Sequence, residues 1–165
     1  MLPGIPPQYY YPLFALLMLV VVFVFVPKEK FGSLFWVSLI WGYVGTFLFN
    51  GIVGAGLDWF DWRFSGGFQV LGVSHWLALA WLLAMMLFLR FLPTRKAIYA
   101  FPGYLVAFAW ASGMLDLQFH QLGLLVYHHW NPFYRFLLGL IWFYGAARHQ
   151  WALERLPHQN GKEEI

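Results

Sequence analysis

The feature that most constrains this chain is a series of long apolar runs from which charged side chains are nearly absent. No charged residue precedes Lys28, and the run from Tyr9 to Val26 is entirely uncharged. A helix of about 20 apolar residues crosses the roughly 30 Å hydrocarbon layer of a bilayer. The runs are continuous and show no period-two alternation, so they predict membrane-spanning helices and not strands.

Five such runs fit the chain. They predict an all-α fold: a polytopic integral membrane protein, with a bundle of about five transmembrane helices in one domain covering residues 1–165. The expected spans cover residues 9–26, 31–57, 70–92, 97–117 and 132–149, followed by a polar tail over 150–165. Asn131 followed by Pro132 predicts the N-cap and first turn of the last span.

The composition supports a lipid environment and excludes several kinds of chemistry. Hydrophobic residues make up 61% of the chain and charged residues 10%, against roughly 45–50% and about 25% in soluble domains. The absence of cysteine excludes disulfides, thiolate metal sites and cysteine nucleophiles. The formal charge of +3 lies mostly in short segments between the runs, so it indicates topology and we expect no nucleic-acid partner.

Basic residues are divided unequally between the two faces that five spans create. Arg63 and Arg135 lie toward one face. The other face receives Lys28, Lys30, Arg95, Lys96, Arg148, Arg155 and Lys162. Basic residues in short loops stay in the cytoplasm. We therefore expect a multi-pass plasma-membrane protein with its N-terminus outside and its C-terminus in the cytoplasm.

Small residues are concentrated in the second run. The segment from Gly51 to Gly56 lacks the lysine of a phosphate-binding loop and follows no strand. Small residues instead allow close packing of membrane helices. We expect Gly51 and Ala55 to form such a contact, either within the bundle or in a homo-oligomer.

The expected extracytoplasmic face collects most of the costly polar groups. The candidate binding residues are His75, Asp116, His120, His128, His129, Asn131 and Arg135. Asp116 and His120 are four residues apart and share one face of a helix. The short connection between the last two spans favours antiparallel neighbours, which would let Arg135 pair with Asp116.

Three functions remain open for this polar set. Ionisable residues inside a membrane are functional candidates by default, so we favour a non-enzymatic component that binds or conducts a small polar solute or ion, alone or in a larger assembly. The first alternative is a metal-dependent membrane enzyme of hydrolase type at the outer leaflet, with Asp116, His120 and His128 as ligands of a divalent metal. No catalytic residue is assigned.

The second alternative is a purely structural membrane subunit, in which the histidines and an Asp116–Arg135 pair form a satisfied polar cap. Haem is disfavoured as a cofactor, because His75 and His149 are expected on opposite sides of the membrane. The expected partners are membrane lipid and either a second copy or another membrane protein.

The aromatic segment around Trp59, Phe60 and Trp62 is typical of the aromatic belt at a membrane interface. A stacking platform for a ligand is the alternative interpretation.

The stretch from Gly123 to Tyr134 carries a family resemblance. Tyr127-His128, Trp130-Asn131 and the later Arg148 resemble the C-terminal signature of a family of small, uncharacterised multi-spanning membrane proteins of endospore-forming Firmicutes. That family usually has glycine where this chain has His129. The resemblance implies a five-span fold in a Gram-positive plasma membrane, and it implies no activity.

Overall fold

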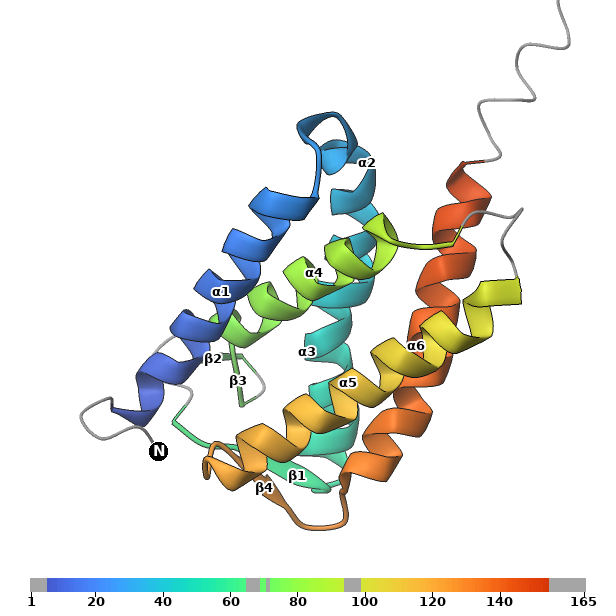
Figure 1. Cartoon of the computed structure of the whole chain (residues 1–165). Helices are drawn as coiled ribbons and strands as arrows, with labels where there is room; N and C mark the ends of the chain where they lie inside the picture. Colours follow the sequence, from blue (N-terminus) through green and yellow to red (C-terminus); the bar gives the residue numbers. More distant parts are fainter. Residues whose placement is uncertain (1–5, 65–68, 71, 94–98, 155–165) are drawn as a thin grey trace, which may run out of the picture.

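The computed structural model describes residues 6–64, 69–70, 72–93 and 99–154. In this part of the chain, five helical passes run in alternating directions (Figure 1). The first pass is a short 3-10 turn, η1 (Pro7–Tyr9), followed by α1 (Tyr10–Phe25). The second pass is a continuous helix made of α2 (Lys28–Ser38), η2 (Leu39–Val44), α3 (Gly45–Phe49) and η3 (Asn50–Gly56). The last three passes are α4 (His75–Arg90), α5 (Phe101–Gln121) and α6 (Pro132–Leu153). The predicted helical fold is confirmed.

Two of these helices are long and apolar enough to cross a membrane: Pro7–Phe25, with 19 residues, and Lys28–Gly56, with 29. We call the second of them the second helix. Its segments η2 and η3 are π-helical.

The third pass is shorter than expected. The predicted span starts at residue 70, but α4 begins at His75 and has 16 residues, a length of about 24 Å. The preceding residues form a hairpin of β2 (Gln69–Val70) and β3 (Val73–Ser74), with Gly72 at a φ of 76°. A positive φ suits glycine and allows the chain to turn. The Ser74 side chain then caps α4 by accepting from Trp76 N.

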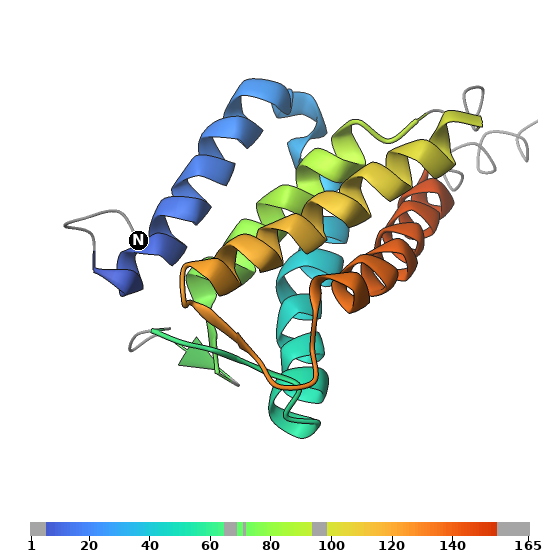
Figure 2. The same cartoon turned by 60° about the horizontal axis from the view of Figure 1, so that its bottom comes forward.

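A second pair of strands joins two loops that are distant in sequence. β1 (Phe60–Trp62) and β4 (Leu125–Tyr127) are antiparallel, with Phe60 opposite Tyr127. Figure 2 shows them together across one end of the bundle. The Tyr11 hydroxyl on α1 donates to the carbonyls of Arg63 and Leu124, which flank these strands. This end of the molecule therefore links the first helix to both loops.

Helix packing depends on small residues at points of close approach. α5 and α6 lie antiparallel and side by side, as predicted (Figures 1 and 2). A Cβ added at Gly139 of α6 would lie 3.2 Å from Ala109 Cα of α5. On the second helix the close approach is at Gly42, where a Cβ would lie 2.5 Å from Leu82 Cα of α4. Ala55 is exposed, so the predicted contact through Gly51 and Ala55 in an oligomer stays a prediction.

Candidate functional site

The candidate site is a pocket enclosed by the second helix, α4, α5 and α6, and closed toward one end by β1. Its empty volume is about 610 Å³, including the space at its open mouth. Aromatic side chains make up much of the wall: Trp41, Phe49, Phe60, Trp62, Trp81, Trp142 and Phe143. Polar side chains are fewer: Thr46, Asn50, Ser112, Asp116 and Arg135.

An ion pair lies in this wall near the β1–β4 end. Asp116 is on the last turns of α5 and Arg135 on the first turn of α6. The distance from Arg135 Nε to Asp116 Oδ1 is 3.7 Å, and their side chains are only 17% and 6% exposed. Asp116 Oδ2 also accepts a hydrogen bond of 3.1 Å from the Trp130 indole. The predicted pairing of Asp116 with Arg135 is therefore present.

The Arg135 guanidinium has aromatic neighbours in place of hydrogen-bond acceptors. Its Cζ lies 4.5 Å from the centre of the Trp81 ring and 5.6 Å from that of Phe49. These are cation–π contacts. Among the described residues no acceptor lies within hydrogen-bond reach of the group, and its Nε is buried without a partner. A guanidinium has five N–H donors, so this one has unused donor capacity beside the pocket.

Several other polar groups at the wall are already bonded within the chain. The Trp62 indole donates to Asn50 Oδ1 at 2.7 Å, and the Asn50 amide donates to the Thr46 carbonyl at 2.6 Å. The Trp142 indole donates to the Trp41 carbonyl at 2.8 Å. The Trp41 indole donates to His149 Nδ1 at 3.0 Å. These bonds hold the indoles in fixed positions around the pocket.

Both π-helical segments contribute to the pocket. Trp41 and Gly42 come from η2, and Asn50 from η3. π-Helical turns are rare and occur frequently at functional sites. Here they place the Asn50 amide and the close contact of Gly42 with α4 at one wall of the pocket.

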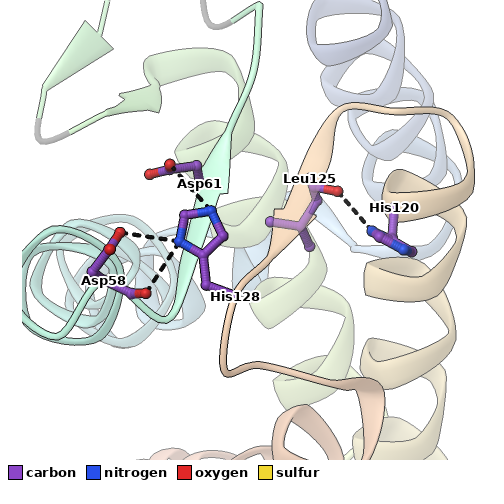
Figure 3. Close-up of polar contacts among 5 residues, drawn as sticks. All are labelled: Asp58, Asp61, His120, Leu125 and His128. Carbon is purple, nitrogen blue, oxygen red and sulfur yellow. Dashed lines mark hydrogen bonds and ion pairs between the residues drawn. The ribbon is translucent and has the colours of Figure 1, made fainter.

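The predicted histidines do not share one site. His128 lies between Asp58 and Asp61, as Figure 3 shows: its Nδ1 is 3.1 Å from Asp58 Oδ1, and its Nε2 is 3.7 Å from Asp61 Oδ2. His120 points toward the Leu125 carbonyl, 2.9 Å from its Nδ1 (Figure 3). The same ring stacks on Tyr127.

The remaining predicted residues have separate partners. His75 contacts the Tyr43 hydroxyl through Nδ1 at 2.7 Å. His129 is exposed, and its backbone N–H donates to the Trp59 carbonyl. Asn131 caps α6, because its Oδ1 accepts from Tyr134 N at 3.0 Å. The predicted capping role of Asn131 is confirmed, and the side chain is committed to that role.

The proposed metal ligands Asp116, His120 and His128 contact different partners. The group that does converge, within the described ranges, is Asp58, Asp61 and His128, whose ligand atoms lie within 4.8 Å of one another. Carboxylates and imidazole suit zinc and similar divalent ions. All three residues are exposed, and the contacts of His128 with the two carboxylates also explain their closeness.

Burial affects the one ionisable group of β4. It raises the pKa of the Tyr127 phenol above its usual range, and the nearby Asp116 carboxylate acts in the same direction, against a smaller opposing effect of Arg135. The Tyr127 hydroxyl is buried without a hydrogen-bond partner among the described residues. Tyr127 therefore stays neutral at physiological pH.

Sequence reasoning missed Asn50 and Trp81 at the pocket wall and Trp130 as the hydrogen-bond donor to Asp116. Asn50 interrupts an apolar run, and an amide inside an expected membrane span is a signal that could have found it. The two indoles carry no such signal, because tryptophan occurs throughout the chain. Phe60 is only 3% exposed and packs on Trp130. Phe60 of the aromatic segment therefore belongs to the interior, whereas the ligand-stacking role of the segment stays a prediction.

No family model, curated protein or solved structure matches this chain. The resemblance of its C-terminal segment to the small multi-spanning family therefore stays a prediction.

Proposed function

We propose that this chain is a five-span plasma-membrane protein that binds or conducts a small polar solute through the pocket, without catalysing a reaction. One observation carries the proposal. Arg135 is mostly buried at the pocket wall, pairs loosely with Asp116 and has no hydrogen-bond acceptor among the described residues. Buried hydrogen-bond donors without an acceptor are costly, and a bound solute with acceptor oxygens would satisfy them.

The apolar surface supports the membrane part of the proposal. Large apolar side chains are exposed along several passes, with Phe23 71% and Ile141 72% exposed. Further examples are Leu16, Val24, Trp36, Ile52 and Trp110. Soluble proteins rarely expose so much contiguous apolar surface, whereas lipid covers it without cost. The five alternating passes support five spans (Figure 1).

The ends of the helices support the proposed orientation. Lys28 begins α2, Arg90 ends α4, and Arg148 lies in the last turns of α6. These basic residues gather at the end of the bundle opposite β1 and β4 (Figure 1). Basic residues favour the cytoplasmic side. The Asp116–Arg135 pair lies toward the other end, which we assign to the extracytoplasmic face.

Binding in the pocket is tested with the purified protein in a neutral detergent, using phenylacetamide and phenylacetate as probes. The pocket indoles report binding through tryptophan fluorescence. Ser112 is buried at the pocket wall, and neighbouring Ala111 is exposed. We expect Ser112→Leu to abolish binding of any probe that binds and Ala111→Leu to preserve it. Binding of no probe, or equal binding by a folded Ser112→Leu variant, would overturn the proposal.

A second candidate function is a metal-dependent enzyme at the same face. The convergence of Asp58, Asp61 and His128 favours it. Elemental analysis of the purified protein separates the two candidates. Stoichiometric zinc or iron that is lost in Asp61→Asn would favour the enzyme, and metal-free protein that binds a solute would favour the first proposal.

A further inference from the structure

We infer that Arg135 makes this pocket selective for a monocarboxylate attached to an apolar body, an inference that rests on the proposed binding function and names its ligand class. Three features of the wall point to this ligand class: its unused hydrogen-bond donors, the charges already present there, and the apolar surface around the guanidinium.

Most of the unused hydrogen-bonding capacity belongs to donors of Arg135, beside one carboxylate oxygen, Asp116 Oδ1, that lies 3.7 Å from Arg135 Nε. The indoles of Trp41, Trp62 and Trp142 all donate within the chain. The hydroxyls of Thr46 and Ser112 donate to backbone carbonyls of their own helices. The Arg135 guanidinium has no acceptor among the described residues, so a ligand that fits must bring acceptor oxygens.

The charges of Arg135 and Asp116 determine which ligands with hydrogen-bond acceptors can bind. The positive charge of Arg135 disfavours a cationic ligand. Asp116 Oδ1 lies only 3.7 Å from Arg135 Nε, so every negative charge bound there is also repelled by this carboxylate. A phosphate dianion meets about twice the repulsion that a monoanion meets. A carboxylate combines a single charge with the planar, two-oxygen geometry that guanidinium binds best.

The surface around the guanidinium defines the rest of the ligand. Trp81 covers one face of the group at 4.5 Å, so the remaining N–H donors are available at the edge of the planar group. Phe49, Phe60 and Phe143 continue the wall with apolar rings. A carboxylate held at the guanidinium edge therefore has a hydrophobic surface for an aromatic ring or a short acyl chain.

The inference is tested by fluorescence titration of the full chain in a neutral detergent with three matched probes: phenylacetate, the neutral phenylacetamide and the cationic phenethylamine. Octanoate forms a fourth arm, and its affinity relative to phenylacetate shows whether a fatty acid or a ring acid is the better source. Because hydrogen bonds to charged groups are strong, we expect phenylacetate to bind at least about tenfold more tightly than phenylacetamide. We expect phenethylamine to bind least.

Variants assign the selectivity to one residue. Arg135→Gln should reduce the affinity for phenylacetate at least about tenfold and leave that for phenylacetamide nearly unchanged. Arg135→Lys keeps the charge without the planar fork, so it should retain part of the preference, and it replaces the glutamine variant if that variant does not fold. Arg63→Gln is the matched control, because Arg63 is an exposed arginine at the same end of the molecule. It should bind all probes as the parent does.

The outcomes separate this inference from the proposed function. If phenylacetamide or phenethylamine binds as tightly as phenylacetate, or if a folded Arg135 variant keeps the full preference, carboxylate selectivity is overturned while the binding pocket remains. If no probe binds, both proposals fail.

Discussion

At the scale of single residues, the β1–β4 end of the bundle depends on a short series of polar contacts. The Trp130 indole donates to Asp116, Asp116 faces Arg135, and Arg135 lies over Trp81. A buried ion pair stabilises little when it is complete, but loss of one partner leaves an uncompensated charge. These contacts therefore make each member sensitive to substitution.

The first prediction is energetic coupling between Asp116 and Arg135. We expect Asp116→Asn and Arg135→Gln each to lower the free energy of unfolding by about 1–3 kcal/mol, because each leaves a charge without its partner. The double variant should lose at least about 0.5 kcal/mol less than the sum of the single losses. Unfolding in detergent measures all four species, and strictly additive losses would show that the pair is not energetically coupled.

The second prediction concerns the Trp130 indole. Trp130→Phe keeps a buried aromatic ring and removes the donor to Asp116, so it should cost about 1.5–3 kcal/mol of stability. Trp110→Phe makes the same chemical change at an exposed position of α5 and should be nearly neutral. The difference between the two melting temperatures is the measurement. Equal losses would contradict a stabilising bond to Asp116.

The same residues show what sequence alone could supply. The Asp116–Arg135 pair was predictable because both residues lie near the ends of helices joined by a short loop. The partners of His120 and His128 were not, because they depend on the pairing of β1 with β4. Helical spacing placed His120 beside Asp116, yet its ring turns to the Leu125 carbonyl. Residue spacing within one helix gives no information about such long-range strand contacts.

At the scale of elements, the second helix determines how closely the bundle packs. Gly42 lies in its first π-helical segment and meets the backbone of α4. The sequence predicted close packing on this helix from its small residues, but it identified Gly51 and Ala55. Glycine composition identifies a helix that can pack closely, whereas the neighbour that it meets is decided by the tertiary fold. Similarly, the hairpin before α4 was missed because residues 70–74 are as apolar as the helix that follows.

The third prediction tests that contact. Gly42→Ala places a Cβ 2.5 Å from Leu82 Cα, where only backbone movement relieves the clash, so it should cost about 1–3 kcal/mol. Gly32→Ala lies on the same continuous helix with nothing within 4 Å of the added Cβ. The control should be neutral or stabilising by up to about 1 kcal/mol, since alanine favours helix. If thermal unfolding shows Gly42→Ala to be more stable than Gly32→Ala, Gly42 is not required for close packing against α4.

At the scale of the whole molecule, five alternating passes separate two chemically different ends. The pocket's ion pair and the β1–β4 strands lie toward one end, and Lys28, Arg90 and Arg148 lie toward the other (Figure 1). The number of helical passes and their order were predictable, because each apolar run is long enough to form a helix. The pocket was not, because its walls come from four passes and one strand.

The fourth prediction tests the proposed orientation. The chain has no cysteine, so a single introduced thiol can be read without background. Gln69 on β2 and Glu29 on α2 are both exposed and lie at opposite ends. We expect Gln69→Cys to react with an impermeant thiol reagent in intact cells and Glu29→Cys to react only after permeabilisation. The reverse pattern would invert the topology.

The pairing of β1 with β4 has a consequence for biosynthesis. The two strands are separated by α4 and α5 in sequence, and Arg135 follows β4 on the last helix. A ribosome must therefore synthesise most of the chain before β1 can pair with β4 or Asp116 can pair with Arg135. Asp116 on α5 is synthesised before Arg135 on α6, so its carboxylate has no counter-charge until α6 has been made. Late closure of this kind exposes the growing chain to misassembly, and truncation before α6 should yield a product that quality-control proteases remove.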